Sequence, residues 1–238
     1  MKKQDRIWEL DALRGLCILC VILIHFLFDL NYFLGLNLAL PAWYLFVQQY
    51  GGVIFVLLSG ACATLGTRSF RRGLIVFGCG LLVTLVTFGM HRFGFVSRDV
   101  VVWFGVLHLL GFCMMFYPVY RKMPTVQLFS CGIVLICAGY LMTNVVVQAK
   151  FLFPLGLVYE GFASGDYFPI LPHLGWFMVG SGLGRVFYAE KSTRFPGTFQ
   201  RSFLARGLCW CGRKSLFIYL LHQPLVYGIL MLILALRG

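Results

Sequence analysis

Seven apolar segments, each about as long as a helix that crosses a lipid bilayer, constrain this chain more than any other feature. The hydrocarbon core of a bilayer is about 30 Å thick, so a spanning helix needs roughly 20 predominantly apolar residues. Hydrophobic residues make up 60% of the 238 residues and charged residues 12%, against about 45–50% and about 25% in a typical soluble domain. The sequence therefore predicts an all-α polytopic membrane protein, a bundle of about seven transmembrane helices. The predicted segments are Leu10–Leu34, Trp43–Leu65, Leu74–Met90, Val100–Tyr117, Val126–Val147, Pro172–Tyr188 and Ser215–Leu236.

The positive charges between these segments predict the orientation of the chain, because cytoplasmic loops collect Lys and Arg. With successive segments crossing in opposite directions, 16 positive residues fall on one side and four on the other. We therefore expect a cytoplasmic N-terminus, an extracytoplasmic C-terminus and a multi-pass location in the plasma membrane. The formal net charge of +12 follows mainly from this topology, so we expect no nucleic-acid partner.

Other sequence features argue for a single transmembrane domain over residues 1–238. No internal repeat is visible. The sequence is compatible with a monomer and with a homodimer. The nine cysteines lie within or close to apolar runs, where cysteine acts as a small hydrophobe, and Cys209-Trp210-Cys211 lacks metal-ligand spacing, so we expect no metal. Gly180-Ser181-Gly182-Leu183-Gly184 predicts a small-residue face for close helix packing. It does not fit a phosphate loop, because no lysine follows the glycines.

Three histidines lie deep inside the predicted spans, where an ionisable side chain is costly and is by default a functional hypothesis. His173 lies at the end of its span and is expected at the membrane interface. At 1.5 Å per residue, His25, His108 and His222 lie roughly 12–21 Å from the inner boundary, within one layer of the membrane. Asp29 follows His25 by four residues, which puts both on one helix face. A carboxylate near an imidazole fixes its tautomer and favours its protonated form, as a general base needs. We expect all four to be catalytic, with structural hydrogen bonds as the alternative.

Basic residues at the predicted cytoplasmic ends of the spans have two interpretations. They can set the topology, and Arg14 can form an ion pair with Asp11 three residues before it. They can also bind the phosphates of a cytoplasmic ligand, since arginine pairs bidentately with phosphate oxygens. The candidate cofactor-binding residues are Arg14, Arg68, Arg71, Arg72, Arg213 and Lys214.

Short strings of sequence, spread over about residues 6 to 230, resemble those of one enzyme family in its own order. They are Arg6-x4-Asp11-Ala12-Leu13-Arg14-Gly15 followed by His25-Phe26-Leu27-Phe28-Asp29, then Phe55-x3-Ser59-Gly60, Phe104-Gly105-Val106-Leu107-His108, Asp166-Tyr167-Phe168-Pro169 and Gly212-Arg213-Lys214-Ser215-Leu216-x2-Tyr219-Leu220-Leu221-His222-Gln223-Pro224. The chain resembles the heparan-α-glucosaminide N-acetyltransferase catalytic-domain family, as a small bacterial-type member.

This resemblance implies a membership in a wider superfamily of transmembrane acyltransferases. Such enzymes take an acyl group from cytoplasmic acyl-CoA and deliver it to a sugar or amino sugar on the far side of the bilayer. Acetyl-CoA would be the co-substrate, and the sugar acceptor and the lipid bilayer would be the other partners. His25 and Asp29 match the polar positions of the family's first helix, and His108 and His222 match its two later histidines.

The leading hypothesis is therefore a transmembrane N- or O-acetyltransferase. His25 would deprotonate the acceptor amine or hydroxyl, or would itself become acylated. A proton-coupled transporter could use the same mid-membrane residues, but the sequence has neither inverted repeats nor paired broken helices. A retinal-type receptor would need a Schiff-base lysine, and the last span has none in its interior.

Overall fold

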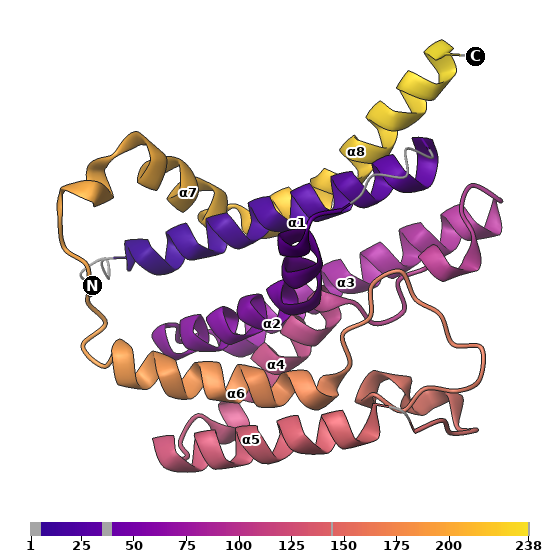
Figure 1. The fold of residues 1–238 in the computed structure, drawn as a ribbon. Helices are drawn as coiled ribbons and strands as arrows, with labels where there is room; N and C mark the ends of the chain where they lie inside the picture. The colour runs from indigo at the N-terminus through magenta and orange to yellow at the C-terminus, as the bar shows by residue number, and fades with distance from the viewer. Residues whose placement is uncertain (1–5, 35–39, 144, 238) are drawn as a thin grey trace. The chain divides into compact units, whose positions relative to one another are not determined.

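A computed structural model describes residues 6–34, 40–143 and 145–237, and there the chain folds into α-helices joined by loops (Figure 1). The α-helices are α1 (Trp8–Leu34), α2 (Ala42–Leu65), α3 (Ser69–Arg92), α4 (Val106–Tyr120), α5 (Thr125–Met142), α6 (Ile170–Phe187), α7 (Phe203–Arg213) and α8 (Ser215–Arg237). The loops contain three short 3-10 helices, η1 (Arg98–Val100), η2 (Lys150–Leu155) and η3 (Thr198–Arg201). Within these ranges there is no β-strand, only two isolated β-bridges, so the predicted all-α class is confirmed.

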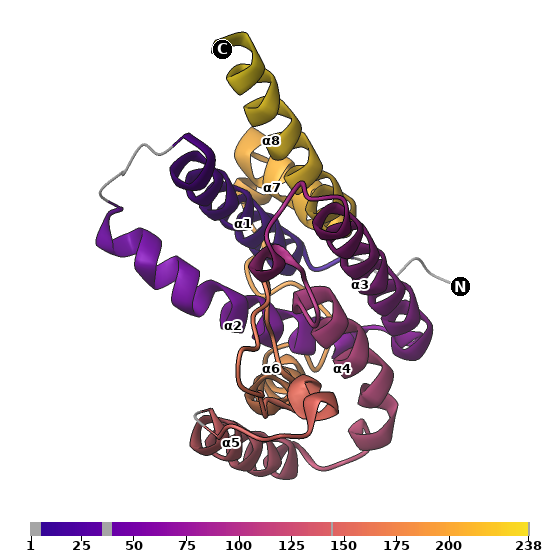
Figure 2. The same ribbon diagram turned by 90° about the vertical axis from the view of Figure 1, so that its right-hand side faces the viewer.

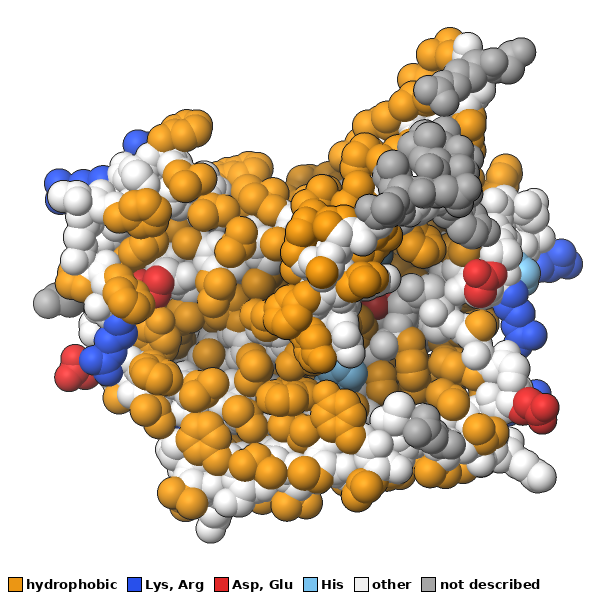
Figure 3. Space-filling view, in the orientation of Figure 1, with side chains coloured by type: hydrophobic (Ala, Val, Ile, Leu, Met, Phe, Trp, Pro, Cys, Tyr) orange, Lys and Arg blue, Asp and Glu red, His pale blue; other side chains and the backbone are white. Residues whose placement is uncertain are grey.

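Each predicted apolar segment coincides with an α-helix. Among the residues described, five helices are long and apolar enough to cross a membrane, namely α1, α2, α3, α5 and α8. Helix α4 has only 15 residues, and α6 is not among these five although it has 18, so the count of seven spans and the orientation of the termini stay predictions. Hydrophobic side chains cover most of the face in Figure 3, and residues as apolar as Leu85 and Leu141 are 67% and 83% exposed. Such a surface fits a lipid environment.

The structure differs from the sequence prediction at three helices. Helix α5 ends at Met142 and not at Val147, and the other two differences concern α4 and α7. Helix α4 begins at Val106 rather than at Val100, because the residues before it are extended and Gly105 precedes the first turn. Helix α7 was not predicted as a helix at all. It has 11 residues, and the arginines Arg206 and Arg213 interrupt its apolar pattern, so a search for long apolar runs passes over it.

The chain divides into two compact units, one formed by Met1–Phe55 with Glu190–Gly238 and the other by Val56–Ala189. The expectation of a single domain over residues 1–238 stays a prediction. We call them the terminal unit and the central unit and describe each by itself.

In the terminal unit, α1 packs against both α7 and α8 (Figure 2). Helices α1 and α7 cross so closely that only glycine fits at the crossing. A Cβ on Gly15 would lie 1.9 Å from the carbonyl oxygen of Leu208, and one on Gly212 would lie 1.8 Å from that of Asp11. This crossing fixes the start of α8, which follows α7 after one residue.

In the central unit, α3 packs against α4, and α5 against α6. The predicted small-residue face of α6 is confirmed. A Cβ on Gly180 would lie 2.1 Å from the carbonyl oxygen of Leu57. The Ser181 hydroxyl lies 3.2 Å from the Gly60 carbonyl of α2 and 3.0 Å from the Phe177 carbonyl of its own helix. The string Phe55-x3-Ser59-Gly60 thus supplies part of a close helix contact.

Candidate active site

Two histidine rings lie next to each other between α1 and α8 of the terminal unit. The ring centroids of His25 and His222 are 5.1 Å apart, and the ring planes are tilted by 58°. Nδ1 of His222 is bonded to the carbonyl oxygen of Tyr219. Because a carbonyl only accepts, Nδ1 carries the hydrogen, and in the neutral ring Nε2 carries the lone pair. That Nε2 atom is buried and has no hydrogen-bond partner within the described ranges, so the structure holds a basic nitrogen ready to accept a proton or a hydrogen bond.

The carboxylate of Asp29 lies in the same unit and is 3% exposed. Its Oδ2 atom accepts a hydrogen bond from Nε2 of Gln223 at 2.9 Å. The carboxylate of Asp29 therefore bonds to an amide on α8. The sequence had predicted the imidazole of His25 as its partner, because Asp29 lies one turn after His25 on α1. Gln223 escaped the sequence analysis because a neutral amide gives no charge signal. Its position next to His222 in the string His222-Gln223-Pro224 was the available hint.

Three of the predicted phosphate-binding residues lie at the beginning of α8 or beside it. Nη2 of Arg14 lies 3.4 Å from the hydroxyl of Ser215, the first residue of α8. Arg213 and Lys214 immediately precede that serine and are exposed. The first and last strings of the family resemblance, more than 200 residues apart, thus meet at one end of the terminal unit.

The alternative ion pair between Asp11 and Arg14 is wrong, because the carboxylate of Asp11 pairs instead with Arg6 at 3.4 Å. Arg14 points its guanidinium toward α8, and its Nε atom is buried without a hydrogen-bond partner among the described residues. Arg14, Arg213 and Lys214 thus gather at the start of α8, whose first turn has no acidic residue. The carboxylates near this end, those of Glu9 and Asp11, come from α1.

The third predicted histidine, His108, belongs to the central unit and is 2% exposed. Its Nδ1 accepts from the Gly105 N–H at 3.2 Å, and its Nε2 lies 3.3 Å from the Thr84 hydroxyl. That hydroxyl donates its only hydrogen to the Val102 carbonyl at 2.6 Å, so Nε2 of His108 must be the donor to Thr84. Both ring nitrogens are therefore occupied, and the ring also stacks on Phe104 at 5.4 Å. This geometry favours a role in holding the residues before α4.

A second pair of family strings meets around His108. Oδ2 of Asp166 accepts from the first N–H of α4, that of Val106, at 2.9 Å, which satisfies one of the free donors at a helix N-terminus. Phe104 and Tyr167 form a β-bridge, and the Tyr167 hydroxyl donates to the Phe153 carbonyl at 2.6 Å. Burial raises the pKa of this phenol to about 12. The loop between α5 and α6 is thus tied to the residues that begin α4.

The other three predicted phosphate-binding residues also belong to the central unit. Arg68 precedes α3, and Arg71 and Arg72 lie in its first turn. All three are exposed. The structure therefore brings His25, Asp29 and His222 together in one unit with Arg14, Arg213 and Lys214, and it places His108 and the arginines of α3 in the other.

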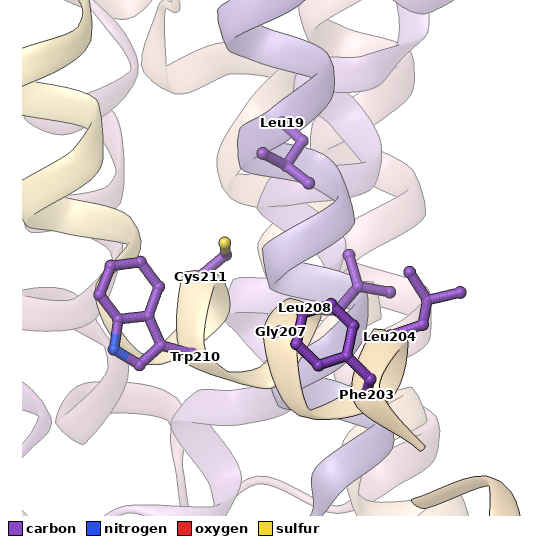
Figure 4. A pocket seen from close by; sticks show the side chains of 7 residues that line it. All are labelled: Leu19, Phe203, Leu204, Gly207, Leu208, Trp210 and Cys211. Carbon is purple, nitrogen blue, oxygen red and sulfur yellow. The ribbon is translucent and has the colours of Figure 1, made fainter.

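An apolar groove runs along α7 in the terminal unit and has a volume of about 330 Å³. Figure 4 shows the side chains that line it, which come from α1 and α7. Apart from the thiol of Cys211, they offer no ionisable group. The lining residues are Leu19, Phe203, Leu204, Gly207, Leu208, Trp210 and Cys211. Since its lining has no carboxylate or imidazole to act as a base, the groove is a poor candidate for acid–base chemistry.

Comparison with known families identifies the chain. A family model described as "Heparan-alpha-glucosaminide N-acetyltransferase, catalytic" matches residues 6–224, nearly the whole chain. The chain belongs to this family. Searches of curated proteins and of solved structures gave no significant match. Membership confirms the resemblance seen in the short strings and places the chain in a membrane acetyltransferase-like family, in which acetyl-CoA is in general the donor.

Proposed function

We propose that this chain is an integral-membrane acyltransferase of the plasma membrane. It moves an acyl group, preferably acetyl, from cytoplasmic acyl-CoA to an amino sugar or a sugar hydroxyl. One observation carries the proposal: the rings of His25 and His222 are 5.1 Å apart, and Nε2 of His222 is buried without a partner in the described ranges. Paired imidazoles inside apolar helices are costly to keep, and proton transfer from a nucleophile is the chemistry that they suit best.

The donor side of the proposal rests on the basic residues at the start of α8. Arg14, Arg213 and Lys214 would hold the phosphates of CoA, as guanidinium and ammonium groups do in other phosphate sites. His25 lies eleven positions after Arg14, which is about 16 Å along an α-helix. Helix α1 therefore links the phosphate-binding end to the histidine pair, and the thioester would lie toward the histidines. Arg68, Arg71 and Arg72 are a second candidate set for the same phosphates.

The chemistry needs one base and a path for the proton. His25 accepts the proton of the acceptor amine or hydroxyl as the nucleophile attacks the thioester carbonyl, and the proton then goes to the departing CoA thiolate. His222 supports this exchange, because the lone pair on its Nε2 atom can accept a hydrogen bond from the reacting groups. In the covalent variant, His25 attacks the thioester carbonyl, the C–S bond breaks and the CoA thiolate leaves. The acceptor then attacks acyl-His25, His25 leaves as the imidazole, and the proton of the acceptor passes to the thiolate. His108 and its partner Thr84 would support the fold of the central unit, since neither ring nitrogen is free to exchange a proton.

The test is CoA release by the purified protein in lipid nanodiscs. Acetyl-CoA is supplied with glucosamine, a simple amino sugar, and with glucose, which offers only hydroxyls. We expect free CoA and an acetylated sugar to appear together, in larger amounts with the wild-type protein than in a control without protein. Absence of CoA release with both sugars would contradict the proposal. Proton uptake by proteoliposomes without CoA release would favour a transporter instead.

A further inference from the structure

The side-chain amide of Gln223 has a fixed orientation, and it has no role in the reaction as proposed above. Its Nε2 donates to Oδ2 of Asp29 at 2.9 Å, and an ionised carboxylate can only accept. The NH₂ end of the amide must therefore face Asp29, which leaves the Oε1 end facing elsewhere. That Oε1 atom is buried and has no hydrogen-bond partner in the part of the chain that the structure describes.

The adjacent residue of α8 repeats the same pattern. His222 is 7% exposed, its Nδ1 is held by the carbonyl of Tyr219, and its Nε2 is buried without a partner within the described ranges. Two consecutive side chains thus each have one polar atom fixed by the protein and one acceptor atom left unsatisfied. Buried acceptors without a donor are rare in folded proteins and call for an explanation.

We propose that Gln223 binds the acceptor substrate, and that Asp29 is a positioning residue that acts through Gln223. Oε1 of Gln223 accepts a hydrogen bond from an N–H or O–H of the acceptor, beside Nε2 of His222. Asp29 keeps the amide from turning its NH₂ end toward the substrate. This inference rests on the proposed acyltransferase function, and it gives Asp29 a different task from orienting His25.

An exchange of the two side chains tests this assignment. In Q223E two carboxyl groups face each other and share one proton. The oxygen that faces the substrate is then no longer fixed as an acceptor, which should lower kcat/KM for glucosamine at least tenfold. In the double variant D29N/Q223E, the amide of the new Asn donates to the new Glu, whose second oxygen still accepts. We expect this exchange to recover most of the loss. If Asp29 acted instead by holding a charge next to His25, the double variant would stay as inactive as Q223E.

A second variant, similar to Gln223 in shape, keeps the inference testable if the charged variants do not fold. Gln223→Met removes both the donor and the acceptor, and it should lower kcat/KM for glucosamine at least tenfold while KM for acetyl-CoA stays within twofold. Gln49→Met, at an exposed position of α2, is the matched control and should behave as wild type. Unfolding temperatures show which variants are folded.

Wild-type turnover in Gln223→Met overturns the inference, and so does a folded D29N/Q223E variant without recovery. Either result leaves the proposed function standing, because wild-type turnover is measured in the same assay. A wild-type protein that releases no CoA overturns both. If the double variant does not fold, Gln223→Met decides the role of Gln223.

Discussion

Replacement of Gly212 by alanine should destabilise the protein, because α7 crosses α1 at this residue. The added Cβ would lie 1.8 Å from the carbonyl oxygen of Asp11, about half of an ordinary contact distance. The obstacle is backbone, so the two helices must move apart. Overpacking of this kind costs about 1–3 kcal/mol, and in a chain of this size each kcal/mol shifts Tm by about 2–4 °C. We expect Tm of Gly212→Ala to fall by about 2–12 °C in these terms.

The assay is thermal unfolding in detergent, followed by far-UV circular dichroism. Gly207→Ala is the matched control, because it lies on the same helix and its Cβ would meet nothing within 4 Å. Alanine is favoured over glycine in a helix by about 1 kcal/mol, so the control should keep or raise Tm. Equal Tm values for the two variants would refute the close crossing. Since the crossing also fixes the start of α8, Gly212→Ala should weaken CoA binding as well.

Three further predictions concern the loop between α5 and α6, the donor site and the topology. Tyr167→Phe removes the hydrogen bond to the Phe153 carbonyl, and it should lower the free energy of unfolding by about 0.5–1.5 kcal/mol. Burial raises the pKa of Tyr167 to about 12, so its neutral form contributes stability that is fully present below pH of about 10 and is lost as the pH rises toward 12. The wild type should lose stability in that window more steeply than Tyr167→Phe, and parallel pH profiles would contradict this. Arg71→Ala should weaken CoA binding more at low salt than at high salt, as measured by calorimetry, and an unchanged affinity would leave this arginine a topological signal only. A reporter fused after Gly238 should be extracytoplasmic and one inserted within residues 193–200 cytoplasmic, and the opposite labelling would overturn the orientation.

The sequence predicted the helices that depend on apolar length and missed what depends on local packing. Among the described residues, long apolar runs identified every α-helix except α7, a short helix beside α1 that carries two arginines. The glycines of α6 were predicted correctly as a packing face, because small residues at a spacing of four have few other uses in a membrane. The crossing at Gly15 and Gly212 could not be predicted, since it joins residues nearly 200 positions apart.

For the candidate site, the sequence identified the costly residues but not their partners. His25 and His222 were predicted to share a layer of the membrane, and the structure places their rings 5.1 Å apart. The carboxylate of Asp29 was assigned to the nearest imidazole on its own helix, because spacing along one helix is all that a single sequence supplies. Its partner Gln223 comes from another helix.

The proposed acyl transfer depends on the histidine pair between α1 and α8, in which His25 is the base or the nucleophile. The most direct measurement is the turnover of acetyl-CoA by His25→Ala, with His91→Ala, a histidine near the end of α3, as the matched control. Loss of a general base lowers turnover by roughly 10²–10⁴-fold, so His25→Ala should fall by at least that factor while CoA binding and Tm stay close to wild type. A His25→Ala protein with wild-type turnover, alongside an inactive His108→Ala or His222→Ala protein, would contradict the account and make His25 a residue of the scaffold only.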